Sequence, residues 1–216
     1  MSTTNRGVFI TFEGPEGSGK STQLRMLAAR LRESGQRVFE TAEPGGTRIG
    51  TQIRRVLLDA QNQEMRPTTE LLLMFACRAQ NVDEWILPAL AEGQIVLSDR
   101  FTDSTLVYQG IARGLGVDVV YEVDRIACRG LTPDLTLVID IDTETGLKRA
   151  RTRNRRTQDV ETRLDEQDVS FHRRVRDAYH QLAADEPKRV RLIDGGRAES
   201  LVAEDVWQAV QSFLVE

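Results

Sequence analysis

The residues Gly14-Pro15-Glu16-Gly17-Ser18-Gly19-Lys20-Ser21-Thr22 are the most informative stretch of the chain, because they match the pattern G-x-x-x-x-G-K-[ST] of a phosphate-binding loop. The apolar run 8–12 precedes them and predicts a buried strand, and a helical pattern with apolar positions 24, 27, 28 and 31 follows. In such a loop the backbone N–H groups turn inward around a polyphosphate, and the helix N-terminus adds the positive end of its dipole. We expect residues 14–22 to bind ATP or GTP, with Lys20 at the β- and γ-phosphates and the Ser21 hydroxyl on Mg²⁺.

Length and composition limit the class of protein. A chain of 216 residues is expected to form a single domain, 1–216, with a small lid. Its net charge of -4 argues against general nucleic-acid binding, because nucleic-acid binders usually carry a basic surplus. Cys77 and Cys128 lack metal-ligand spacing and are expected to be buried free thiols. Since no apolar run approaches the length of a membrane span, we expect a cytoplasmic protein with no membrane partner.

Apolar runs alternate with helical patterns along the whole chain, which predicts an α/β fold with parallel strands. The expected strands are 8–12, 37–40, 94–99, 135–140 and 189–194, and the expected helices are about 20–34, 48–59, 68–91, 117–129, 143–153, 168–184 and 199–214. The fold class is therefore a five-stranded parallel sheet flanked by helices. Ligands bind at the carboxyl ends of the strands in such a sheet, so the residues directly after each run are candidates for the site.

Asp99 and Arg100 follow the third run and combine a carboxylate for Mg²⁺ with a cation for a phosphate. Asp140 and Asp142 compete with Asp99 for the metal role, because they follow the fourth run. The chain has only two histidines, His172 and His180, and both are expected on the surface. Phosphoryl transfer to a monophosphate needs little general-base help, since the acceptor is already largely dianionic at neutral pH.

Arginines are concentrated between residues 149 and 156, and on a helix the pairs Arg149/Arg153 and Arg151/Arg155 repel each other by a few tenths of a kcal/mol. An anion that binds there would relieve this repulsion. We therefore expect a mobile lid at about residues 150–165 that closes over ATP phosphates. The alternative is a charged surface segment whose arginines are paired with neighbouring acids, Asp159, Glu161 and Asp165.

Four segments together resemble bacterial thymidylate kinase, a family of P-loop nucleoside monophosphate kinases. They are Phe12–Thr22, Glu43-Pro44-Gly45-Gly46-Thr47, Ser98–Thr105 with Tyr108-Gln109-Gly110, and Thr132-Pro133-Asp134. The resemblance extends over nearly the entire chain. It implies transfer of the γ-phosphate of ATP to dTMP, with Mg²⁺, in a homodimer whose interface would lie near residues 69–91.

The resemblance also implies roles for individual residues. Arg100 would bind the 5′-phosphate of dTMP, Arg78 and Thr105 would contact the base, and Tyr108 would pack under the deoxyribose. The implied dTMP-binding set is Glu43, Phe75, Arg78, Arg100, Thr105, Tyr108 and Gln109; the implied catalytic set is Lys20, Glu16, Arg100 and Arg153. ATP would be bound by the loop from Gly14 to Thr22 together with Arg153 and Arg155, and Mg²⁺ by Ser21 and Asp99.

The chain departs from the family pattern at three places. Ala42 stands where the family usually has an arginine, so that contact is missing or is replaced by Arg48. The lid ends in Thr162-Arg163-Leu164-Asp165 in place of Asp-Arg-apolar-Glu, and we assign more weight to Arg163 than to the acid. The ring that would stack on thymine is Phe75, but Met74 is the alternative residue to face the base.

Two other functions remain open at this stage. The chain could phosphorylate a different small acceptor, such as dUMP, a cytidylate or an alcohol. It could also be a nucleotide-dependent switch, although such a protein needs no acceptor site.

Overall fold

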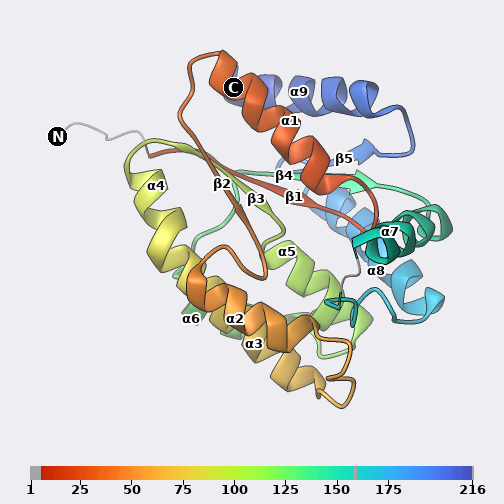
Figure 1. Ribbon diagram of the computed structural model, residues 1–216. Coiled ribbons are helices and arrows are strands. Elements are labelled where there is room, and N and C mark those ends of the chain that lie inside the picture. The colour runs from red at the N-terminus through yellow and green to blue at the C-terminus, as the bar shows by residue number, and fades with distance from the viewer. Residues whose placement is uncertain (1–5, 158–159, 216) are drawn as a thin grey trace.

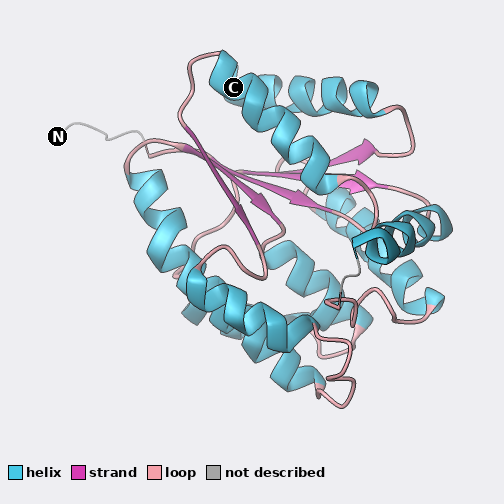
Figure 2. Cartoon of the chain, viewed as in Figure 1, coloured by secondary structure: helices cyan, strands magenta, loops and turns pink. Residues whose placement is uncertain are grey.

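The computed structural model describes residues 6–157 and 160–215 and shows an open parallel sheet between two layers of helices (Figure 1 and Figure 2). The strands are β1 (Phe9–Glu13), β2 (Val38–Ala42), β3 (Ile95–Asp99), β4 (Leu135–Asp140) and β5 (Val190–Asp194). They are ordered β2-β3-β1-β4-β5, and each neighbouring pair is parallel. The expected fold class is confirmed.

The helices are α1 (Lys20–Glu33), α2 (Arg48–Leu58), α3 (Pro67–Asn81), α4 (Leu87–Ala91), α5 (Thr102–Thr105), α6 (Val117–Ala127), α7 (Thr143–Thr157), α8 (Val169–Asp185) and α9 (Glu199–Val215), with π-helical turns η1 (Val82–Ile86) and η2 (Leu106–Ala112). All the helices except α9, which follows the last strand, lie in the connections between successive strands. Helices α1 and α9 cover one face of the sheet, while α3, η1, α4 and α6 cover the other (Figure 1).

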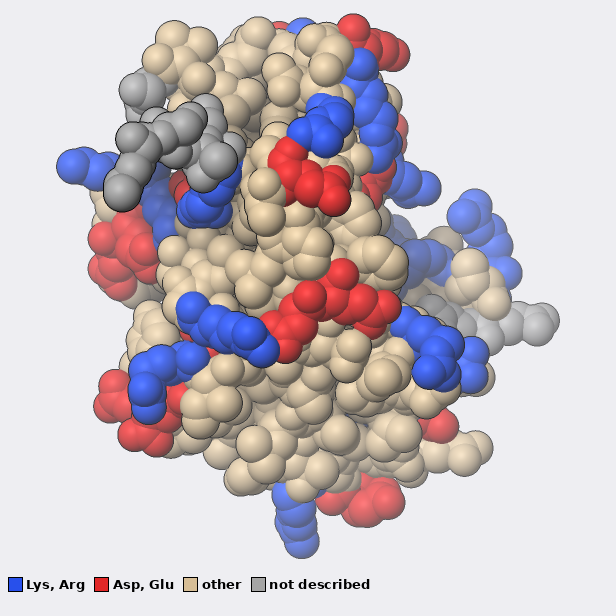
Figure 3. All heavy atoms as spheres, turned by 90° about the vertical axis from the view of Figure 1, so that its left-hand side faces the viewer, with Lys and Arg blue, Asp and Glu red and all other residues tan. Residues whose placement is uncertain are grey.

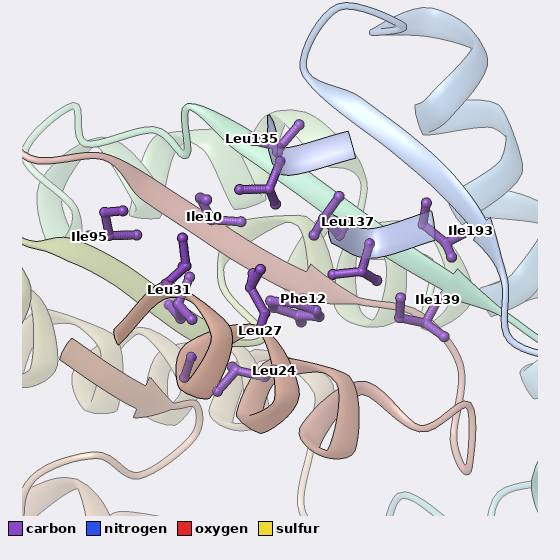
Figure 4. Close-up of a cluster of buried hydrophobic side chains, with 14 of the residues drawn as sticks. Ile10, Phe12, Leu24, Leu27, Leu31, Ile95, Leu135, Leu137, Ile139 and Ile193 are labelled. Carbon is purple, nitrogen blue, oxygen red and sulfur yellow. The ribbon is translucent and has the colours of Figure 1, made fainter. Parts of the chain in front are cut away.

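β1 lies in the middle of the sheet because every one of its side chains is buried. Ile10 and Phe12 point to the α1 side, where Leu24, Leu27 and Leu31 of that helix pack on them (Figure 4). Phe9 belongs to the cluster on the opposite face, as the two-residue period of a strand requires. A strand that is paired on both edges and covered by helices on both faces has no side facing solvent. This position explains why residues 8–12 form an almost continuous apolar run.

The expected strand positions agree with the structure to within two residues at each end. The expected helix 68–91 is a continuous helical rod, but the π-helical turn η1 interrupts its regular hydrogen bonding. The helical stretch from Thr102 to Ala112 was not predicted. Its threonines and Gly110 have low helix propensity and weaken the helical pattern. Part of the stretch is also π-helical, and a search for the 3.6-residue period of an α-helix does not detect that geometry.

The loop between β1 and α1 is in close contact with the start of α7. A Cβ atom on Gly17, whose φ is +69°, would lie 2.1 Å from the Gly146 carbonyl oxygen. A Cβ on Gly146 would in turn lie 2.4 Å from the Glu16 carbonyl oxygen. Both positions need glycine because each backbone occupies the space that the other's side chain would fill, so α7 is positioned directly against the loop.

Among residues 6–157 and 160–215, no helix is both long and apolar enough to span a bilayer. On the face seen in Figure 3, basic and acidic side chains are interspersed with uncharged ones, and no broad basic area appears.

Packing on the sheet predicts a difference between two leucines. Leu137→Ala, in the buried core of β4, should lower the free energy of unfolding by about 2–5 kcal/mol, because it leaves a cavity between sheet and helices. Leu192→Ala is the matched control, since Leu192 lies on the edge strand β5 and is 43% exposed. Urea denaturation of both variants measures the difference, and equal losses would contradict the assignment of the core.

Candidate functional site

A cavity of about 620 Å³ runs along the carboxyl edge of the sheet and contains both halves of the expected site. Its walls come from the loop and α1, from the turn after β2, from α3, from the β3–η2 segment and from α7 with the segment that follows it. The expected site residues on its walls are Glu16, Gly17, Gly19, Lys20, Ser21, Thr22, Glu43, Arg78, Asp99, Arg100, Thr105, Tyr108, Gln109 and Arg153. One continuous space thus joins the phosphate loop to the expected acceptor residues.

Lys20 is held at the mouth of the loop by the loop's own backbone. Its Nζ donates hydrogen bonds to the carbonyl oxygens of Gly14 at 3.0 Å and Pro15 at 2.9 Å. Burial, and next to it the nearby Arg100, lower the pKa of Lys20 to about 8, although Glu16 and Asp99 favour the charged form. The ammonium is therefore mostly charged at neutral pH. A phosphate bound next to it would stabilise this charge and offset the effect of burial.

Ser21 and Asp99 lie next to each other, as expected for a metal-binding pair. The Ser21 hydroxyl donates a hydrogen bond to the Asp99 carboxylate. The two competing carboxylates have other partners: Asp140 forms ion pairs with Arg176 and His180 of α8, and Asp142 accepts hydrogen bonds from Thr145 at the start of α7. The geometry therefore favours Asp99 over both alternatives.

Glu16, Arg100 and Tyr108 form a connected group across the cavity from the metal pair. The Arg100 guanidinium donates to Glu16 at 2.6 Å and to the Tyr108 hydroxyl at 3.2 Å, and Tyr108 donates to Glu16 at 2.9 Å. Burial alone would raise the pKa of Glu16, but Arg100 and Lys20 outweigh it and hold that pKa at about 2. An anionic carboxylate thus neutralises the arginine on the cavity wall.

Arg78 is anchored in a buried pocket by Glu43. Its Nε donates to the Glu43 carboxylate at 2.5 Å, and its Nη2 donates to the Thr105 hydroxyl at 2.9 Å and to the Phe101 carbonyl at 3.0 Å. Glu43 also accepts from Asn81 at 3.0 Å. Sequence reasoning missed this supporting role of Glu43, because the residue that it holds lies on a different element.

The structure corrects the expected stacking residue. Phe75 is 2% exposed and packs in the core with Phe9 and Phe101, whereas Met74 lies on the cavity wall. A one-residue step on a helix rotates the side chain by about 100°, so the two neighbours cannot share one face. Of the two candidates, Met74 therefore lines the cavity and Phe75 does not.

The arginine run is also corrected at one position. Arg149 and Arg153, four residues apart on α7, both line the cavity, but Arg155 lies with Arg151 and Lys148 in a separate depression on another face of the helix. Arg155 is therefore not placed to contact a nucleotide in the cavity, and Arg149 takes its place. The helical period could have shown this, because positions 149 and 153 share a face and 155 does not.

Arg163 lies in the segment expected to form a lid, but it is buried and does not line the cavity. It is 2% exposed; its Nη1 donates to Glu70 at 2.7 Å and its Nε to the Leu57 carbonyl at 2.7 Å. Asp165, two residues on, lines the cavity, and burial together with Glu16 raises its pKa to about 6. Residues 158 and 159 of the expected lid, including Asp159, lie outside the described residues.

Three further expectations have clear outcomes. Arg54 of α2, not Arg48, occupies the wall beside Ala42, where it donates to the Pro44 carbonyl at 2.8 Å. His172 is 1% exposed, so the surface position expected for it is wrong, while the side chain of His180 is 43% exposed. Cys77 and Cys128 are buried free thiols, as expected.

Comparisons with known proteins show the family to which the chain belongs. Residues 12–206 match the family model described as thymidylate kinase. A thymidylate kinase of Trichlorobacter lovleyi is 50% identical over 208 residues, 96% of this chain and 98% of that protein, and one of Geobacter sulfurreducens is 52% identical over 88% of this chain and 89% of that protein. The crystal structure of thymidylate kinase from Ehrlichia chaffeensis superposes with a TM-score of 0.76 at 31% identity, covering 95% of this chain and 99% of that one. The chain therefore belongs to the thymidylate kinase family, whose members phosphorylate dTMP to dTDP with ATP in the synthesis of dTTP.

Proposed function

We propose that the cavity holds ATP and dTMP end to end, with the ATP phosphates in the loop 14–22 and the dTMP phosphate at Arg100. Arg78, Thr105 and Gln109 would then surround the thymine, and Met74 would form its apolar wall. This arrangement brings the γ-phosphate and the acceptor phosphate together between two cations, Lys20 and Arg100. Catalysis becomes positioning plus charge neutralisation, so no strong general base is required.

One observation carries this proposal: Nη1 of Arg78 is buried and has no hydrogen-bond partner within the described part of the chain. A buried guanidinium N–H without an acceptor is costly unless a ligand supplies one. Arg163 also has such an atom, Nη2, but does not line the cavity, whereas Arg78 does. A carbonyl oxygen of thymine has the chemistry to fill this gap.

Magnesium fits the residues present. A hydroxyl and a carboxylate, on Ser21 and Asp99, are the oxygen donors that Mg²⁺ uses, and no group of three or more His, Cys, Asp or Glu side chains is close enough to form a metal site in residues 6–157 and 160–215. Such a sparse protein set suits Mg²⁺, which keeps waters and takes phosphate oxygens. The bound ion would supply charge neutralisation on the donor phosphates.

The lid residues would complete the cationic surroundings of the transferred phosphoryl group. The loop has no arginine at Glu16, Gly17 or Ser18, so the positive charge on that side would come from Arg153 and Arg149 of α7. Arg153 is paired with Asp165 at 3.3 Å in a partly exposed contact, which exchanges at little cost for a phosphate. We propose that this segment moves to close over ATP.

Tyr108 would select the deoxyribose. Its hydroxyl is fixed by Glu16 and Arg100, and its ring lies under the Arg100 guanidinium, whose Cζ is 4.9 Å from the ring centroid. Because both the hydroxyl and the ring of Tyr108 are held in this way, the side chain cannot move aside to make room for the 2′-hydroxyl of a ribose. The proposal therefore includes discrimination against ribonucleotides.

We further propose a homodimer and a cytoplasmic location, both on the basis of the family resemblance. Leu72 of α3, Trp85 of η1 and Ile126 of α6 are exposed apolar side chains on the helical layer that would form the dimer interface.

The reaction is tested by measuring ADP release and product identity with Mg-ATP and a panel of dTMP, dUMP, ribothymidine monophosphate, CMP and AMP. dTMP should give the highest kcat/KM, with weak dUMP turnover, because one methyl group is worth only about 1–3 kcal/mol of discrimination. ADP release without any phosphorylated product would indicate a nucleotide-dependent switch instead.

Arg78→Lys should raise KM for dTMP about tenfold and leave KM for ATP nearly unchanged, because lysine keeps a charge beside Glu43 but cannot make the fork of hydrogen bonds. Steady-state kinetics with each substrate varied in turn measures this. Arg129→Lys is the control, since Arg129 forms an exposed pair with Asp83. An unchanged KM for dTMP in Arg78→Lys would remove Arg78 from the base pocket.

The two faces of α7 give a further prediction. Arg149→Ala should lower kcat/KM for ATP about tenfold through loss of a phosphate contact, and Arg155→Ala should leave it within about twofold. The two variants remove the same side chain from the same helix, so general effects on α7 cancel. Equal effects in both would show that the cavity face has no special role.

A further inference from the structure

Glu13 is a buried acid for which the proposed reaction has no use. It is the last residue of β1, its side chain has no exposed surface, and it lies behind the phosphate loop and outside the cavity wall. Its carboxylate accepts hydrogen bonds from the Phe101 backbone N–H at 2.7 Å, from the Tyr179 hydroxyl at 2.9 Å and from the Ser104 hydroxyl. Two of these donors, Phe101 and Ser104, belong to the turn that carries Arg100.

That turn has a conformation that needs support. Arg100 has a φ of +73°, in the left-handed region that a residue with a side chain rarely adopts. Two consecutive backbone N–H groups hold it to the end of β1: Arg100 donates to the Phe12 carbonyl at 2.9 Å, and Phe101 donates to Glu13. Glu13 therefore accepts one of the two backbone N–H hydrogen bonds that tie the turn to the end of β1.

The same carboxylate also controls the Arg100 side chain. Ser104 donates its hydroxyl proton to Glu13, which leaves its oxygen free to accept from Nη1 of Arg100 at 3.0 Å. The other terminal nitrogen, Nη2, then reaches Glu16 and Tyr108 on the cavity wall. The buried Glu13 carboxylate thus orients both the backbone of Arg100, through Phe101, and its side chain, through Ser104.

The charge of Glu13 and that of Arg100 depend on each other. Burial and the neighbouring Asp103 raise the pKa of Glu13 to about 7, while Arg100 and the hydrogen bonds from Ser104 and Phe101 favour the ionised form. The carboxylate is therefore stabilised by the group that it orients.

We propose that Glu13 is a positioning residue that presents Arg100 to the phosphate of the acceptor nucleotide. It sets the affinity for that phosphate and not for the nucleoside part of the acceptor. The inference rests on the proposed role of Arg100 and extends it to a residue that touches no substrate.

The test compares dTMP with thymidine, which lacks the phosphate, in wild type and Glu13→Gln. Glutamine keeps the size and an acceptor for Phe101, but it loses the charge and the second carboxylate oxygen. The dissociation constant for dTMP should rise about tenfold or more, while the inhibition constant of thymidine against dTMP should stay within about twofold. KM for ATP should rise less than KM for dTMP.

Two variants separate positioning from folding. Tyr179→Phe removes a hydrogen bond to Glu13 and a contact with the Ser104 hydroxyl, but it leaves the hydrogen bonds from Phe101 and Ser104 to Glu13 in place. The preference for dTMP over thymidine should therefore stay as in wild type. Ser104→Ala removes the hydroxyl that links Glu13 to Nη1 of Arg100, together with its contact with Tyr179, and should lower the same preference in part. Because Ser104→Ala leaves Glu13 in place, it tests the proposal even where Glu13→Gln unfolds in a thermal scan. Equal weakening of dTMP and thymidine in Glu13→Gln, or an unchanged preference in Ser104→Ala, would overturn the inference.

Failure of the underlying assignment gives a different result. If Arg100 does not bind the acceptor phosphate, Arg100→Ala will retain the wild-type preference for dTMP over thymidine. If only the inference about Glu13 is wrong, Arg100→Ala will lose that preference and Glu13→Gln will keep it.

Discussion

The complete burial of β1 is the constraint on which the rest of the structure depends. Its side chains are enclosed on both faces, and β3 and β4 pair with it along its two edges. The chain must therefore leave the sheet at its centre, and the loop that follows lies where neighbouring strands also end. Asp99 and Arg100 leave β3 beside it, so the proposed Mg²⁺ ligand and the proposed acceptor cation reach the loop without any long connection.

The arginines of the site are held by carboxylates rather than left exposed. Glu43 holds Arg78, Glu16 holds Arg100, and Asp165 holds Arg153. The three pairs differ in burial: both side chains of the Arg78–Glu43 pair are almost fully buried, whereas the Arg153 side chain is 51% exposed and that of Asp165 is 12% exposed. In the proposed function the buried pair is a fixed wall of the base pocket, and the more exposed Arg153 belongs to the segment that closes over ATP.

Most of the fold and part of the site could be predicted from the sequence. Strand and helix positions followed from periodicity, Lys20 and Ser21 from the phosphate-loop motif, and Asp99 from its place at the end of an apolar run. Arg155 was assigned wrongly because a run of arginines shows charge but not which face of the helix meets the nucleotide. Phe75 was preferred over Met74 for its chemistry, although the helical register puts Met74 on the cavity wall. The hydrogen bonds of Glu13 and the buried Arg163–Glu70 pair join segments far apart in the chain, and no local pattern reports such contacts.

Met74 would give the proposed base pocket a different character from the aromatic wall expected from the family. A thioether chain with three rotatable bonds is soft and polarisable and has no fixed plane. Such a side chain would contact a base by adapting to it and not by offering a preformed stacking surface, so its ordering would become part of the binding entropy. On this proposal the pocket is rigid on the Arg78–Glu43 side and deformable on the Met74 side, and the bound ligand completes its final shape.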